Sequence, residues 1–120
     1  MKLAALCLVC SCGAGWACEP GLGAVPMLAK ENAPAVYLTV PAPPVSEPFD
    51  IELQFCGDIT TVSVSAIMPA HQHGMNYFPK IEAREDGVVG VSGMVFHMPG
   101  IWQIQVSSGT ASYTHDITVQ

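Results

Sequence analysis

Apolar and polar residues alternate with a period of two in several short segments, and this pattern constrains the fold more than any other. In Phe49–Phe55 the apolar residues alternate with Asp50, Glu52 and Gln54. Such alternation is typical of a strand with one buried face, because successive side chains point to opposite sides of a sheet. Ten prolines and eleven glycines interrupt the chain too often for long helices. We therefore predict an all-β fold.

The predicted strands follow one another at roughly ten-residue spacing, with turn residues between them. Their expected positions are residues 35–40, 49–55, 60–68, 88–98, 102–106 and 113–119, together with a charged hairpin-like stretch at 82–90 that turns at Asp86-Gly87. About seven short strands favour two packed sheets. Because 120 residues leave no room for a second hydrophobic core, we expect one β-sandwich domain over residues 35–120.

The N-terminus has the pattern of an export signal. Lys2 precedes an unbroken apolar run, Leu3–Cys10, and small residues follow up to Ala17. We predict a signal peptide over residues 1–17, too short to span a bilayer, followed by an extended strap over 18–34. The protein is then periplasmic or secreted. In the alternative reading, an imperfect lipobox leaves a lipid anchor on Cys12.

The cysteines agree with export. Cys7 and Cys10 leave with the signal peptide, and Cys18 and Cys56 remain as a pair. In an oxidising compartment we expect them to form a disulfide. The bridge closes a loop of nearly forty residues, which the chain-entropy model values at about 4 kcal/mol.

Charge and side-chain chemistry exclude several functions. The formal net charge is −6, with only four lysines and arginines, so nucleic acid and anionic lipid surfaces are poor partners. The acidic surface would instead suit a basic patch on a partner protein. The acids cluster in the Glu82–Asp86 turn and on polar strand faces, and we find no Ser/His/Asp set. We therefore expect no enzymatic activity.

A histidine and methionine cluster carries the main functional signal. His71, His73 and Met75 are spaced by two, so on an extended backbone all three point to one side, and Gly74 permits a bend beside them. Imidazole nitrogen and thioether sulfur together suit copper, particularly Cu(I). A second segment about twenty residues later contributes three more candidate ligands, namely Met94, His97 and Met98.

Each candidate ligand also has a structural interpretation. Met68 continues the apolar face of its strand, and we expect it in the core. Met94 and Met98 share a parity with Phe96 that suits core packing equally well. His97 could bond to a backbone carbonyl, and His115 is expected to be structural. The sequence alone leaves open whether the two segments form one site.

Other metal centres fit less well. A blue-copper centre needs a cysteine thiolate beside two histidines, and Cys56 lies far upstream. A histidine-brace monooxygenase needs histidine as the first mature residue, which neither cleavage supplies. Structural zinc would leave the methionines without a role.

Two runs, MPAHQHGMNYFPKI and GMVFHMPGIWQIQV, resemble the YtkA-like/FixH-like group of small exported or membrane-tethered domains. The match covers roughly residues 49–119. It implies an immunoglobulin-like sandwich with a periplasmic copper-handling role. Carried over by position, the motifs fall on His71, His73, Gly74 and Met75, and on Phe96, Met98, Pro99, Gly100 and Trp102. A looser likeness to PCuAC copper chaperones departs at the late pair, because His97 and Met98 are adjacent.

The sequence therefore predicts an exported copper-binding carrier, chaperone or buffer. Its expected ligands are His71, His73 and Met75, with His97 and then Met98 or Met94 completing the site. The expected partners are a copper ion and a donor or recipient copper protein. One alternative is a metal-free immunoglobulin-like interaction module. Another is a zinc or Cu(II) site that uses the histidines alone.

Overall fold

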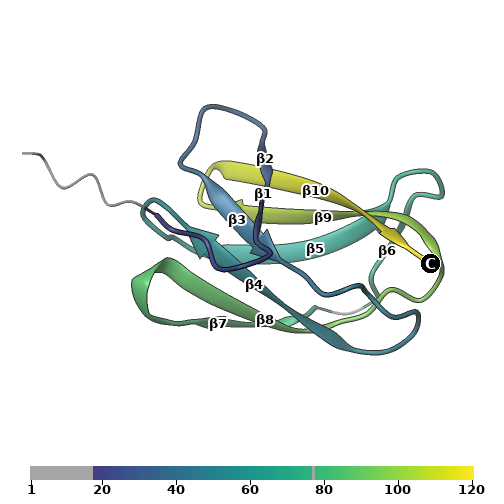
Figure 1. Cartoon of the computed structure of the whole chain (residues 1–120). Helices are drawn as coiled ribbons and strands as arrows, with labels where there is room; N and C mark the ends of the chain where they lie inside the picture. Colours follow the sequence, from purple (N-terminus) through teal and green to yellow (C-terminus); the bar gives the residue numbers. More distant parts are fainter. Residues whose placement is uncertain (1–17, 77) are drawn as a thin grey trace, which may run out of the picture.

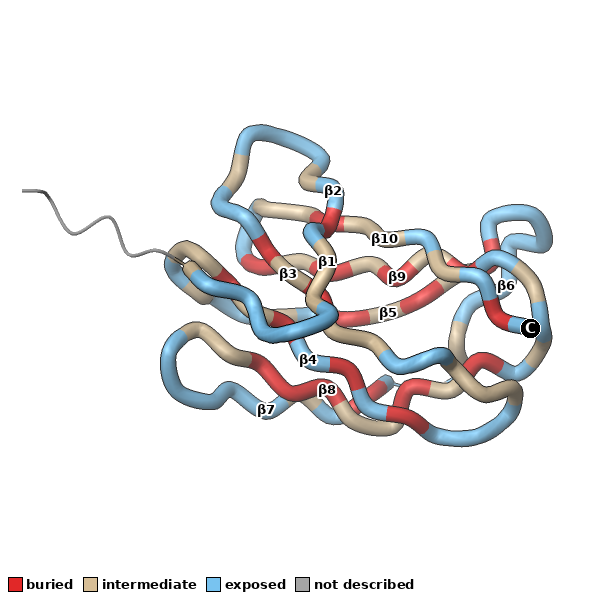
Figure 2. The backbone as a smooth tube through the Cα atoms, in the orientation of Figure 1, coloured by how far each residue is buried: buried red, intermediate tan, exposed pale blue. Residues whose placement is uncertain are grey.

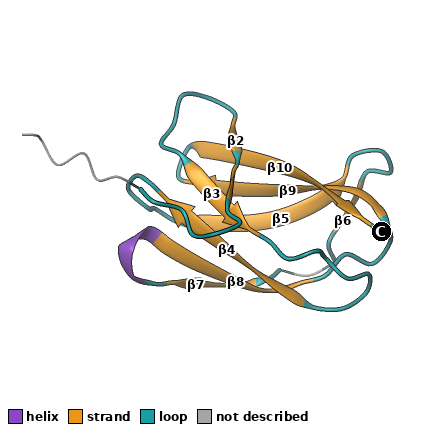
Figure 3. Cartoon of the chain, viewed as in Figure 1, coloured by secondary structure: helices purple, strands orange, loops and turns teal. Residues whose placement is uncertain are grey.

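A computed structural model describes residues 18–76 and 78–120 of the chain. The predicted signal peptide, with Cys7, Cys10 and Cys12, lies outside the described residues. Two antiparallel five-stranded sheets pack face to face (Figures 1 and 3). Among the described residues, no helix is long and apolar enough to cross a membrane.

Each sheet combines longer strands with very short ones at its edge. The first sheet contains, in spatial order, β1 (Val25–Pro26), β3 (Val36–Thr39), β4 (Phe49–Phe55), β8 (Val88–Met94) and β7 (Lys80–Ala83). The second contains β2 (Leu28–Ala29), β10 (Ala111–Val119), β9 (Gly100–Ser108), β5 (Val62–Met68) and β6 (His73–Gly74). A single 3₁₀ turn, Glu85–Gly87, joins β7 to β8.

The strand order identifies the sandwich. Without the two-residue strands β1, β2 and β6, seven strands remain, ordered β3-β4-β8-β7 and β10-β9-β5. This is the ABED and CFG arrangement of a constant-type immunoglobulin domain. The prediction of an all-β, immunoglobulin-like two-sheet sandwich is confirmed.

The core lies between the sheets and follows the predicted alternation (Figure 2). In β4 and β9 every second residue is buried, as a strand with one apolar face requires. At the β6 end of the sandwich, Phe96 stacks on Trp102 with ring centroids 4.8 Å apart, and Phe49 lies 5.0 Å from Phe96. All three rings are buried, so this end of the core is rigidly packed.

The segment expected to be an extended strap pairs with both sheets. Its β1 part pairs with β3, and its β2 part pairs with β10. Between them Met27 is 7% exposed and donates its backbone N–H to the Val36 carbonyl at 2.9 Å. The strap therefore closes one side of the sandwich.

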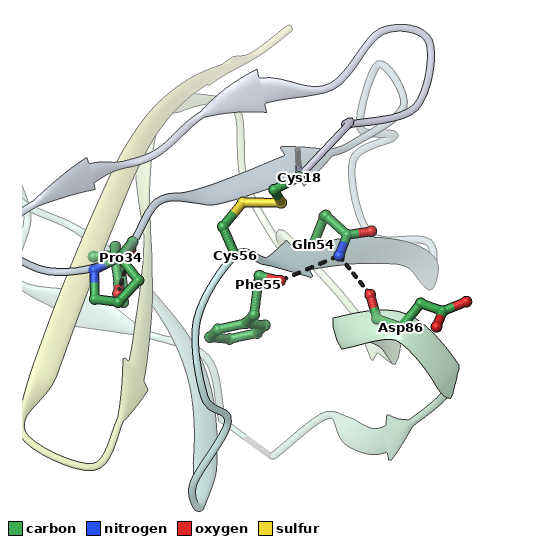
Figure 4. The surroundings of a disulfide bond; sticks show 7 residues. Cys18, Pro34, Gln54, Phe55, Cys56 and Asp86 are labelled. Atoms are coloured by element: carbon green, nitrogen blue, oxygen red, sulfur yellow. Dashed lines mark hydrogen bonds between the residues drawn. A yellow bond between two sulfur atoms is a disulfide. The ribbon is translucent and has the colours of Figure 1, made fainter. Parts of the chain in front are cut away.

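The Cys18–Cys56 disulfide ties the start of the strap to the residue after β4, with a Cα–Cα distance of 5.3 Å (Figure 4). Beside it, the Gln54 side-chain amide donates to the carbonyls of Phe55 and Asp86, at 3.2 and 2.8 Å. The expected cysteine pairing is thus present in the structure. In Figure 1 the disulfide end and the β6 end lie at opposite ends of the long axis.

The predicted strand over residues 88–98 is wrong beyond Met94. Gly93 has a φ of +81°, which bends the chain, and β8 ends at Met94. Phe96 then forms an isolated parallel bridge with Val45, as the chain crosses to the second sheet. Met94 and Phe96 are two residues apart and both buried, as they would be in one continuous strand. The alternation pattern therefore gave no sign of the crossover.

Candidate metal centre

The two histidine and methionine segments meet at one end of the sandwich. The first segment enters the short strand β6, in which His73 pairs with Met68 at the end of β5. The second lies in the crossover between β8 and β9. The ring centroids of His73 and His97 are 6.4 Å apart. The structure therefore brings together two segments that the sequence could not place in contact.

His71 reaches this cluster from a turn and not from an extended backbone. Residues 69–72 connect β5 to β6, and the His71 N–H donates to the Met68 carbonyl at 3.1 Å. Pro69 suits the second position of such a turn, and Gln72 completes it with a φ of +53°. The rings of His71 and His73 nevertheless stack, with centroids 6.2 Å apart and planes 24° from parallel.

Trp102 supports the other half of the cluster from the core. Its indole N–H donates to the Met98 carbonyl at 3.0 Å. The His97 ring lies edge-on to the indole at 5.2 Å, with an interplanar angle of 80°. Because Trp102 is fully buried, both contacts hold the crossover in a defined position. The sequence predicted that Trp102 lies in a strand and matches a family motif. It did not predict the contacts of Trp102 with Met98 and His97.

The candidate ligands differ in exposure. The three imidazoles of the cluster are exposed, whereas Met75 and Met98 are partly buried and pack against the core. Met94 is fully buried, and Met68 is 2% exposed. Met68 is therefore a core residue, as expected. A metal could reach Met94 only if the core opened, so Met94 does not belong with the accessible candidates.

The imidazole spacing allows a simple geometric test. With a metal–nitrogen bond of about 2.0 Å, two ring centroids lie about 6 Å apart for linear coordination and about 5 Å apart for tetrahedral coordination. Both observed separations, 6.2 and 6.4 Å, exceed the tetrahedral value, and rings that stack or lie edge-on to each other must also turn before their nitrogens can point at one ion. The rings would have to close by about 1 Å for a tetrahedral site, a movement open to exposed side chains on a turn and a loop.

Histidine and acidic side chains alone do not form a ready site. Over residues 18–76 and 78–120, no group of three histidine, cysteine, aspartate or glutamate side chains is arranged to hold a metal. A metal centre here would therefore need methionine sulfur or a rearrangement of the rings. The remaining histidine, His115, lies on β10, which β9 and β5 separate from β6.

Comparisons with known proteins inform the fold alone. No family model matches the chain, and no curated protein matches it. The resemblance to the YtkA-like/FixH-like group therefore stays a prediction. Among solved structures, the chain is similar to the Lin-41 filamin domain, with a TM-score of 0.55 and 15% identity over 71% of this chain and 91% of that one. This likeness agrees with the immunoglobulin-like sandwich.

Proposed function

We propose that the protein is an exported copper carrier or buffer that binds Cu(I) through His71, His73 and His97. One observation carries the proposal: three of the four histidines gather at one end of the sandwich, from segments more than twenty residues apart, with neighbouring ring centroids 6.2 and 6.4 Å apart.

Two methionines complete the proposed ligand set. Met98 directly follows His97, Met75 lies two residues after His73, and both methionines are partly buried. Thioether sulfur is a soft ligand that favours Cu(I) over zinc and the hard cations. Because the imidazoles face solvent, a bound ion could pass to a second protein.

Export and the partner class rest on further features. The signal-peptide pattern of residues 1–17 and the Cys18–Cys56 disulfide support an oxidising compartment outside the cytoplasm. The net charge of −6 favours a donor or recipient protein with a basic docking patch. Such charge complementarity would act on the rate of encounter more than on affinity.

The proposal is tested by anaerobic titration of Cu(I) against a competing chelator. We expect the His73→Ala and His97→Ala variants each to bind Cu(I) more weakly by roughly tenfold or more. His115→Ala is the matched control, since it removes the histidine outside the cluster and should leave affinity unchanged.

Two outcomes would contradict the proposed site. Equal Cu(I) affinity in the wild type and a His73→Ala/Met75→Ala double variant would leave the metal-free interaction module as the better reading. Unchanged affinity in a Met75→Leu/Met98→Leu variant, with loss in His73→Ala, would instead indicate a zinc or Cu(II) site built from histidines alone.

A further inference from the structure

The strand β10 has an edge that is open over part of its length. The strap strand β2 pairs only with Tyr113 and Thr114. Among the described residues, no strand pairs with residues 115–119 on that side. Unpaired edge strands are templates for pairing with another chain, and proteins commonly block them with lysine, proline or a short strand length. Residues 115–119 contain no lysine and no proline.

One hydrogen bond reveals which backbone groups face this edge. The Lys30 N–H donates to the Ser112 carbonyl at 2.9 Å, so the backbone of Ser112 points toward the strap. Backbone groups alternate in direction along a strand, and those of Asp116 and Thr118 therefore face the same side. The intervening residues bond to β9. The open edge thus presents two N–H donors and two carbonyl acceptors.

These four groups are complementary to a second copy of the same edge. In an antiparallel pair centred on Ile117, Asp116 of each copy lies opposite Thr118 of the other, and each such pair exchanges two hydrogen bonds. The Ile117 side chains of the two copies then face each other across the two-fold axis. Ile117 is only partly buried in the single chain, so this contact would bury additional apolar surface.

The neighbouring register centred on Asp116 is less favourable. Centring the pair on Asp116 would set the two carboxylates directly opposite each other, which is repulsive. It would also require the edge at Thr114, which β2 occupies. The register centred on Ile117 avoids both problems.

The other sheet edges are less suited to pairing. β7 is four residues long and carries Lys80, and β1 contains Pro26. Among the described residues, no strand pairs with Val62–Ser65 on the open side of β5, and a self-pair of the same kind there would centre on Ser63. It would set serine opposite serine, whereas the pair at β10 sets isoleucine opposite isoleucine.

We propose that the protein forms a two-fold symmetric homodimer through residues 115–119 of β10, which joins two five-stranded sheets into one. Each copy carries a net charge of −6, so the copies repel each other at long range. Salt screens that repulsion, and dimerisation strengthens as ionic strength rises. The dimer is independent of the proposed copper site, since His115 on β10 is not one of its ligands.

Sedimentation equilibrium over a concentration series, at low and high salt, measures the dimer. We expect a monomer–dimer equilibrium with a lower Kd at high salt. Thr118→Pro removes an N–H that faces the open edge and no bond to β9, so it should keep the fold and raise the Kd by roughly tenfold or more. Val62→Pro, which removes an N–H at the start of β5, is the matched control and should leave the Kd unchanged.

A second variant and a second measurement guard against misfolding of Thr118→Pro. Thr118→Lys sets an ammonium opposite Asp116 of the other copy and should lower the Kd by roughly three- to tenfold. The amides of Asp116 and Thr118 should exchange hydrogen more slowly as concentration rises. Three results would each overturn the proposal. The protein could stay monomeric at all concentrations, only Val62→Pro could raise the Kd, or hydrogen exchange at both amides could be independent of concentration.

Discussion

Removal of the Cys18–Cys56 disulfide should lower the free energy of unfolding by about 4 kcal/mol. The two cysteines are separated by 38 residues, and the chain-entropy model assigns a loop of that length about 13 cal/mol/K, or roughly 3.9 kcal/mol at 25 °C. The loss is large beside the roughly 5–15 kcal/mol that stabilises a typical domain. A Cys18→Ser/Cys56→Ser double variant avoids leaving a free thiol.

The assay is urea unfolding followed by the fluorescence of Trp102, which is fully buried and should change its emission on unfolding. With a slope of about 1.3 kcal/mol/M for a domain of this size, the midpoint should fall by about 3 M. Met27→Ala in the disulfide-bonded protein is the matched control, since it weakens the packing of the strap without changing the covalent loop. We expect the control to unfold at a lower midpoint with an unchanged slope.

The reasoning fails if the double variant loses less than about 1 kcal/mol. The disulfide would then lower the conformational entropy of the unfolded chain only slightly. The strap would be held in place by its noncovalent contacts alone. A clear decrease in slope would identify a second effect, because a strap that detaches in the native state leaves less surface to expose on unfolding.

Two further predictions concern stability. Burial raises the pKa of the Tyr113 hydroxyl, which donates to the Pro34 carbonyl at 2.7 Å. Its neutral form thus stabilises the fold fully below the ordinary pKa of about 10, and the contribution is lost as pH rises above that value. Tyr113→Phe should cost about 1 kcal/mol at neutral pH and show a smaller alkaline loss, both measured by urea unfolding; an unchanged alkaline loss would contradict the assignment. Gly87 has a φ of +78°, and a Cβ there would lie 2.5 Å from the Phe55 carbonyl oxygen. Gly87→Ala should therefore lower the melting temperature and cost about 1–3 kcal/mol, whereas Gly21→Ala, with open space around it, should be neutral.

Local patterning was sufficient to predict most of the sandwich. Alternation placed β4 at Phe49–Phe55 and put Trp102 and Ile104 on a buried face, because one-sided burial imposes a period of two. It could not reveal β1 and β2. These strands have two residues each and exist only because the folded sheets offer edges to pair with.

In the candidate site, too, some features could be predicted from the sequence and others depend on the folded structure. Residue chemistry identified His71, His73 and His97, but their proximity depends on a crossover that begins at Gly93 and on a turn through Gln72. The condition of an extended backbone, on which His71, His73 and Met75 would share one side, is not met at His71, because Pro69 starts a turn there. Neither feature has a periodic signal, so neither could be read from hydrophobic spacing.

The disulfide also determines how the domain responds to mechanical force. Tension applied at Cys18 passes through the sulfur–sulfur bond to Cys56, directly behind the central strand β4. The strands β1 and β2 lie within the covalent loop, so the load bypasses them. After reduction, the same tension would reach the strap first and peel its short pairs one after another. Oxidation thus converts an N-terminal segment that would unzip under load into one that is shielded from it.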